Sequence, residues 1–167
     1  MTDDTLFRGR YRIPSARYVG WDYRWAGVYY VTICTRGRMI CLGDVMDGQV
    51  SLSPLGQLVA EEWLKIPRHH LRVDLDEWVI MPDHMHGILI FQGTPREDEL
   101  TLGIVIGRFK AAATKRIWRK LKRTDFNWQT RFHDEILRTP ADLERVRAYI
   151  RGNPANWNPA SPTKTSP

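Results

Sequence analysis

Apolar residues along this 167-residue chain recur at two spacings, one typical of strands and the other of helices. The run 28–35 (VYYVTICT) is β-branched and aromatic, which predicts the first long strand. Residues 46–53 (MDGQVSLS) contain an Asp-Gly turn signal and predict a small hairpin. Apolar positions then repeat at helical spacing over about 54–68, with Ser53 as the expected N-cap and Pro54 as the first helical residue.

A second pair of strands is expected on either side of a Met-Pro-Asp-His turn at 81–84. The segment 73–81 (VDLDEWVIM) leads into the turn, and 84–91 (HMHGILIF) returns from it. The returning strand is apolar on both faces. It therefore predicts a central strand covered on both sides.

Two more helices and a further strand complete the pattern. A long helix is predicted over about 100–122, and a strand within 128–137 (WQTRFHDEIL). The last helix is expected over 140–152, because Pro140 suits its first turn and Pro154 follows its end.

Long connections separate strands that must pair, which favours an antiparallel sheet. We predict an α+β fold, a ferredoxin-like sandwich in which helices pack mainly on one face of a central antiparallel sheet. Residues 1–22 are expected to form an irregular basic arm, 23–158 a single domain, and 159–167 a disordered tail rich in Pro, Ser and Thr.

The chain has neither an apolar run of about 18 residues, as a membrane span requires, nor an apolar signal-peptide region. Cys34 and Cys41 lack zinc-type spacing and are interpreted as reduced thiols, with a disulfide as the alternative. Together these features predict a cytoplasmic protein, associated with the nucleoid when it binds DNA.

Basic residues exceed acidic ones, 25 against 19, which gives a net charge of +6. This balance favours a polyanionic partner, most simply nucleic acid, although a solvated basic surface is the alternative. The cations that we select as DNA-binding candidates lie in the arm, in the helix predicted over 100–122, and in the last helix. They are Arg8, Arg10, Arg12, Lys110, Lys115, Arg116, Arg119, Lys122, Arg123 and Arg145. Trp21, Trp25 and Trp128 could stack on unpaired bases, with core packing as the default for each.

His84 and His86 occupy alternate positions of one predicted strand, so their side chains point to the same face, about 7 Å apart along the backbone. Two imidazoles so placed can bind one divalent ion. The alternative is a pair of ordinary structural histidines. Burial among Ile, Leu, Met and Phe favours the metal site, because an unpaired buried imidazole is costly. A third ligand must come from elsewhere in the fold.

Arg145, Tyr149 and Asn153 follow one another at helical spacing in the last predicted helix. Taken alone, Tyr149 is most simply a core aromatic, and Asn153 a C-terminal cap. Beside a metal site, the same row would supply a cation for phosphate, a nucleophile and an amide ligand. Only about one in a thousand free tyrosine hydroxyls is ionised at pH 7, so attack on a phosphodiester would need a divalent ion to polarise the phosphate.

Four segments, taken as a set, resemble the REP-associated tyrosine transposases, single-tyrosine members of the HUH superfamily of DNA-nicking enzymes. They are YRWAGVYYVTICTRGRMICL (23–42), WVIMPDHMHGILIF (78–91), WQTRFHDEILR (128–138) and YIRGNPANW (149–157). The resemblance covers about residues 20–158. It implies metal-dependent cleavage and rejoining of single-stranded DNA near hairpin-forming palindromes, through a 5′-phosphotyrosine intermediate.

By residue, the resemblance implies that His84 and His86 bind the metal, that Tyr149 is the nucleophile, and that Asn153 is the third ligand. Imidazole and oxygen ligands suit Mg²⁺ or Mn²⁺. A nucleic-acid-binding protein that does not cut, and a phosphodiesterase that uses water, remain alternatives. The DNA target and the choice between monomer and homodimer stay open.

Three polar residues lie near these motifs, and two of them have a second interpretation. His133 and Asp134 could support the metal site, although an ordinary hydrogen-bonded pair is the simpler interpretation. Asp83 is most simply the polar residue of the Pro-Asp turn.

Overall fold

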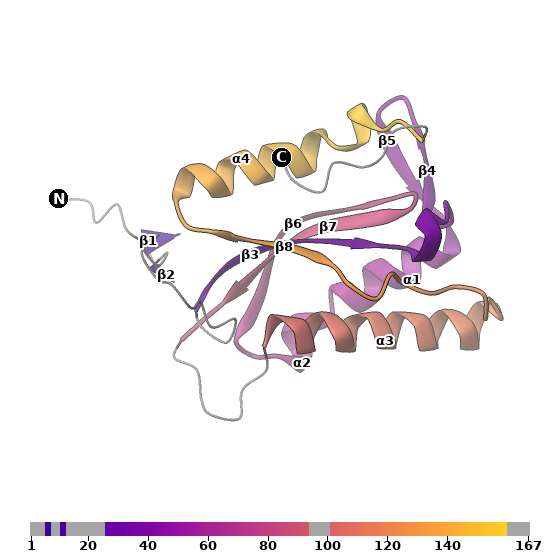
Figure 1. The fold of residues 1–167 in the computed structure, drawn as a ribbon, viewed down its shortest axis with the longest axis horizontal. Coiled ribbons are helices and arrows are strands. Elements are labelled where there is room, and N and C mark those ends of the chain that lie inside the picture. Colours follow the sequence, from indigo (N-terminus) through magenta and orange to yellow (C-terminus); the bar gives the residue numbers. More distant parts are fainter. Residues whose placement is uncertain (1–5, 8–10, 13–25, 94–100, 160–167) are drawn as a thin grey trace.

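The computed structural model describes residues 6–7, 11–12, 26–93 and 101–159. Its centre is a four-stranded antiparallel sheet with the strand order β6-β7-β3-β8 (Figure 1). The strands are β3 (Gly27–Cys34), β6 (Val73–Met81), β7 (His84–Phe91) and β8 (His133–Leu137). The α+β class and the antiparallel sheet are confirmed.

Helices cover both faces of the sheet, and most of them cover the same one (Figure 1). That face carries α1 (Pro54–Trp63), α2 (Ile66–His69) and α3 (Leu102–Leu121). The opposite face is covered by α4 (Pro140–Gly152), whose bounds match the predicted helix.

The prediction of one helix over 54–68 is wrong in one respect, because the structure has two helices there, α1 and α2. Pro67 lies in the first turn of α2 and has no N–H with which to bond the Trp63 carbonyl four residues earlier. The interruption therefore falls where the proline removes a helical hydrogen bond.

Short elements complete the chain. They are the hairpin β4 (Gly43–Met46) and β5 (Gln49–Leu52), the 3-10 turns η1 (Arg36–Arg38) and η2 (Pro154–Asn156), and the strands β1 (Leu6–Phe7) and β2 (Tyr11–Arg12). The β1–β2 pair is antiparallel and corrects the expectation of a wholly irregular arm. The rest of the predicted arm, and the predicted tail after Pro159, lie outside the described residues.

The structure adds one finding on apolar helices and one on the cysteines. Within the described ranges, no helix combines the length and apolarity needed to cross a bilayer. Cys34 and Cys41 are free thiols, as predicted.

Strand β7 is one of the two inner strands of the sheet, and every one of its residues is buried. Met85, Leu89 and Phe91 belong to the core under α1 and α3, whereas Ile88 and Ile90 belong to the core under α4. Because successive side chains alternate between faces, His84 and His86 share the α4 face with the two isoleucines. The polar end of this face is where the candidate site lies.

Candidate functional site

His84 and His86 lie next to each other at the start of β7, directly after the turn from β6. Both side chains are fully buried. Their Nε2 atoms lie 3.0 Å apart, and their ring centroids 4.6 Å apart. Two imidazole nitrogens are thus aimed at a common point, as the alternation along the strand predicted.

The other ring nitrogen of His84 is held by a carboxylate. Its Nδ1 lies 2.6 Å from Asp83 Oδ1, and the second carboxylate oxygen of Asp83 lies 2.9 Å from the Arg38 guanidinium. A proton on Nδ1 leaves the lone pair on Nε2, which is the tautomer that a metal ligand requires. The sequence interpretation of Asp83 as a turn residue missed this second contact. The signal was its position directly before His84, at the start of the strand.

The other ring nitrogen of His86 is held by hydroxyls from β3. Its Nδ1 lies 2.8 Å from the Tyr30 hydroxyl and 2.9 Å from Thr32 Oγ1. A hydroxyl can donate or accept, so these two partners accommodate either tautomer of His86. Sequence reasoning missed both residues, because the register that sets Thr32 opposite His86 is a tertiary property.

Burial keeps both imidazoles neutral. It lowers the pKa of His84 below the ordinary value, an effect that hydrogen bonding to Asp83 opposes. It lowers the pKa of His86 further, and the neighbouring His84 adds to that lowering. Neutral imidazole is the form that coordinates metal ions.

The geometry of the pair fits a metal ion. At metal–nitrogen distances of about 2.1 Å, two ligands at a right angle lie about 3 Å apart, which is the separation of the two Nε2 atoms. In the described part of the chain, no group of three or more His, Cys, Asp and Glu side chains is arranged to hold a metal ion. Within that part of the chain, a side-chain amide is the next candidate for a third protein ligand. Asn153 qualifies, because its side chain makes a hydrogen bond with His84.

Tyr149 of α4 lies over the histidine pair. Its ring centroid is 5.4 Å from that of His86 and 6.4 Å from that of Tyr30. Tyr149 is partly exposed, so a ligand from solvent can approach it. The helix that carries it begins with a reciprocal cap, in which Thr139 and Asp142 bond each other's backbone N–H groups.

The chain after α4 also returns to the site. Asn153 is the C-cap of α4, and the Trp157 ring centroid lies 5.9 Å from that of His84. The structure thus brings together the four residues predicted for catalysis and metal binding: His84, His86, Tyr149 and Asn153. Their roles stay predictions.

The register of β8 separates the two further polar candidates. His133 is the partner of Thr32, so it lies on the face of the histidine pair, and its charge contributes to the lowered pKa of His86. Asp134 is the partner of Val31, which belongs to the core under α3. Because paired residues point to the same face, Asp134 is directed away from the site.

Several of the predicted DNA-binding cations have partners within the protein. Arg145 pairs with Glu135 at 2.8 Å, and Arg123 pairs with Asp125 at 2.7 Å. Arg116 pairs with Glu61 and Glu62, which ties α3 to α1. DNA contacts by these residues would need these ion pairs to exchange.

The remaining predicted cations divide by position. Lys110 donates to the Gln129 and Thr130 carbonyls, at 2.6 and 3.1 Å. Lys115, Arg119 and Lys122 are exposed, and no ion pair is found for them among the described residues. Arg8 and Arg10 lie outside those residues, and Arg12 is in β2.

Of the three tryptophans considered for base stacking, the structure describes one. Trp128 is 3% exposed and packs against Phe109 and Phe126, so the core interpretation holds for it. Trp21 and Trp25 lie outside the described residues.

Both the sequence and the fold of this chain are similar to those of known proteins. No protein-family model matches the chain. An uncharacterized protein of Haemophilus influenzae is 30% identical over 161 residues, which span 86% of this chain and 88% of that protein. The solved structure of a REP-associated tyrosine transposase bound to a REP hairpin has a TM-score of 0.57 and 20% identity, covering 84% of this chain and 73% of that one. The chain belongs to one family with the Haemophilus influenzae protein, and it has the fold of a REP-associated tyrosine transposase.

Proposed function

We propose that this protein is a metal-dependent enzyme that nicks and rejoins single-stranded DNA at hairpin-forming, REP-like palindromes, with Tyr149 as the nucleophile. One observation carries the proposal: a partly exposed tyrosine ring lies 5.4 Å from one of two buried imidazoles whose Nε2 atoms converge to 3.0 Å. The hairpin bound by the solved transposase of the same fold supports the class of substrate. The compartment that fits this function is the cytoplasm, at the nucleoid.

His84, His86 and Asn153 would hold the ion, Mg²⁺ or Mn²⁺. When bound there, a divalent ion supplies Lewis-acid polarisation of a non-bridging phosphate oxygen. Asp83 keeps the His84 ring in place through Nδ1, and Tyr30 and Thr32 do the same for His86. The protein's own contribution is therefore a fixed and neutral ligand pair beside the nucleophile.

Tyr149 performs the covalent step. Its hydroxyl oxygen attacks phosphorus, so a tyrosine O–P bond forms while the bond from phosphorus to the 3′ oxygen breaks. The phenolic proton passes to water, and the 3′ oxygen leaves with a proton as a free 3′-hydroxyl. Attack by a 3′-hydroxyl on the phosphotyrosine reverses the step, so rejoining requires no ATP.

The test is a denaturing gel of labelled single-stranded hairpin DNA incubated with the full chain and Mg²⁺ or Mn²⁺. We expect a slow-migrating, protease-sensitive adduct that disappears in Tyr149→Phe and persists in Tyr29→Phe, a buried tyrosine of the opposite core. His84→Ala should also lose the adduct, with only a modest loss of hairpin binding.

Three results would change the assignment. Cutting without any adduct, retained in Tyr149→Phe, would favour hydrolysis by water. Binding without cutting, with several hairpins and both metals, would favour the alternative of a non-cutting nucleic-acid-binding protein. Retained cutting in His84→Ala would contradict the metal site.

A further inference from the structure

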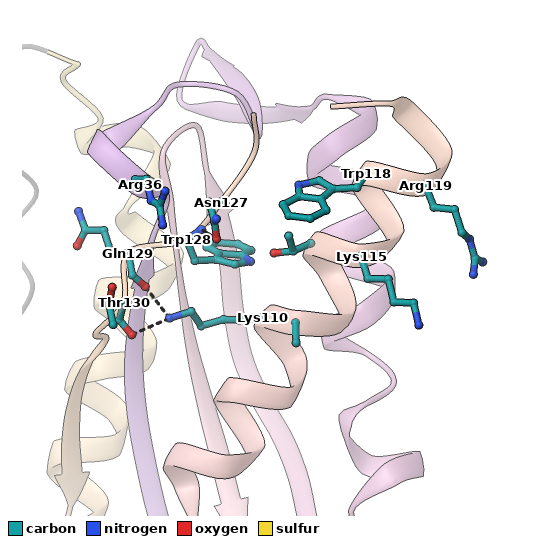
Figure 2. A pocket seen from close by; sticks show the side chains of 11 residues that line it. Arg36, Lys110, Lys115, Trp118, Arg119, Asn127, Trp128, Gln129 and Thr130 are labelled. Carbon is teal, nitrogen blue, oxygen red and sulfur yellow. Dashed lines mark hydrogen bonds between the residues drawn. The ribbon is translucent and has the colours of Figure 1, made fainter. Parts of the chain in front are cut away.

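A hollow lies away from the histidine pair, between the C-terminal half of α3 and the segment 127–130 (Figure 2). Its volume is about 670 Å³, which is in the range of pockets that bind small molecules. None of the metal-site or nucleophile candidates lines it. The hollow, called the α3 pocket below, is therefore a separate site.

Among the described residues, cations line the α3 pocket and no carboxylate does. Arg36, Lys110, Lys115 and Arg119 contribute the charge, and Asn127 and Gln129 are among its polar neutral groups. Burial lowers the pKa of Lys110, which points across the pocket to the 129–130 carbonyls, whereas Lys115 and Arg119 project outward from α3 (Figure 2). Such a lining selects an anionic ligand that also has hydrogen-bonding edges.

Trp118 gives the pocket an aromatic surface. Its side chain is 40% exposed, although its indole N–H donates to the Phe126 carbonyl at 2.9 Å. This hydrogen bond orders the ring before any ligand arrives. An ordered and exposed indole among cations is the combination that binds unpaired bases and their phosphates.

Backbone contacts connect the α3 pocket to the turn at 81–84, which leads into His84. Thr35 forms a bridge with Trp128, and its N–H and hydroxyl both donate to the Asp83 carbonyl. Arg36 follows Cys34, the partner of His84, by two residues, or about 7 Å of extended chain. The histidine pair faces α4 and the pocket lies against α3, so a single strand that reaches both would pass around the end of the sheet at Thr35 and Arg36.

We propose that the α3 pocket binds one unpaired nucleotide of the DNA strand close to the cleaved phosphate, with its base stacked on Trp118 and its phosphates near Lys115 and Arg119. The proposal rests on the proposed function, because it takes the DNA strand of that reaction as the ligand. It adds a base-binding site that the metal and the nucleophile do not supply.

Stacking is tested by comparing two short oligonucleotides of about twelve residues, one of thymidine and one of abasic units with the same phosphates. Fluorescence anisotropy is measured with the full chain in the presence of EDTA, so that no cleavage occurs. The unaltered protein should bind the thymidine strand about tenfold more tightly. Trp118→Leu should lose this preference, and Trp118→Phe should keep most of it, because a ring remains.

Phosphate contact is tested with two matched lysines of α3. Lys115→Gln should weaken binding of both strands and reduce the salt dependence by about one phosphate contact. Lys120 is exposed on the same helix but does not line the pocket, so Lys120→Gln should change the affinity much less. Equal losses in the two variants would contradict a specific role for Lys115.

Photocrosslinking with 5-iododeoxyuridine locates the base directly and does not depend on a variant that folds. Crosslinks within 110–130 are expected. Base preference that persists in Trp118→Leu, or crosslinks only elsewhere, would overturn the pocket and leave the proposed function intact. A protein that binds no single strand at all would overturn both.

Discussion

Arg147 and Asp76 form a two-pronged ion pair between α4 and the edge strand β6. The guanidinium Nε lies 2.8 Å from Oδ1, and Nη2 lies 2.7 Å from Oδ2. The Asp76 side chain is 2% exposed, and it lies at the irregularity of β6 between Leu75 and Trp78. Arg147 precedes Tyr149 by two residues, so this pair anchors the helix that carries the proposed nucleophile.

Replacing Arg147 should therefore destabilise the fold. Arg147→Met would leave a buried carboxylate without the guanidinium, and we expect the free energy of unfolding to fall by roughly 3 kcal/mol. Urea unfolding at neutral pH measures this change in the free energy of unfolding. Arg151→Met is the control, because its side chain is 57% exposed and lies 3.5 Å from Glu77, so its loss should stay below about 0.5 kcal/mol. Similar losses in both would show that the Asp76 pair does not anchor α4.

Asp83 should set the metal affinity through His84. Asp83→Asn removes the carboxylate that holds Nδ1, and the loss of such a partner costs about tenfold to a hundredfold in affinity. Isothermal titration with Mn²⁺ measures the change. Asp134→Asn, on the opposite face of the sheet, should bind as tightly as the unaltered protein. An unchanged affinity in Asp83→Asn would exclude this role.

The elements that could be predicted from the sequence are those specified by local signals. Thr139 caps α4 and Gly152 ends it, so both bounds could be read from neighbouring residues. The alternation along 84–91 likewise placed both histidines on one face, which the structure confirms.

The partners of those histidines could not be predicted in the same way. Thr32 and Tyr30 reach His86 because β3 pairs with β7 in one particular register, more than fifty residues away in the chain. Ion pairs between elements have the same origin. Arg116 belongs to a basic stretch of sequence, yet it meets Glu61 and Glu62 only because α3 packs on α1. Side-chain partners across elements depend on tertiary packing, which local spacing does not encode.

His70 should make the fold sensitive to mild acid. It is 8% exposed, and its Nδ1 has no hydrogen-bond partner within the described ranges. Burial lowers its pKa, and the charges of Arg108 and His69 add to the lowering. The unfolded chain takes up a proton near pH 6.5, before the folded protein does. The stability contributed by neutral His70 is thus complete above about pH 6.5 and is lost as the pH falls toward the folded-state pKa.

Urea unfolding at about pH 7.5 and 5.5 measures this loss. His70→Gln should lose less stability between the two values than the unaltered protein does. His69→Gln, at an exposed neighbour, should retain most of the loss. If His70→Gln is as acid-sensitive as the unaltered protein, the other buried histidines account for the effect.

Gly87 lets α1 pack closely on the central strand beside His86. A Cβ at this position would lie 2.9 Å from Cη2 and 3.2 Å from Cε2 of Trp63, which is fully buried and cannot move aside without disturbing the core. Gly87→Ala should lower the free energy of unfolding by about 1–3 kcal/mol through overpacking.

Gly107 is the matched control, because it lies in α3 and a Cβ there would meet nothing within 4 Å. Gly107→Ala should raise the stability by about 0.5–1 kcal/mol, since alanine loses less backbone entropy in a helix. Urea unfolding should therefore show that Gly→Ala lowers the free energy of unfolding at position 87 and raises it at position 107. A lower free energy of unfolding in both variants would mean that close packing against Trp63 is not what requires glycine at position 87.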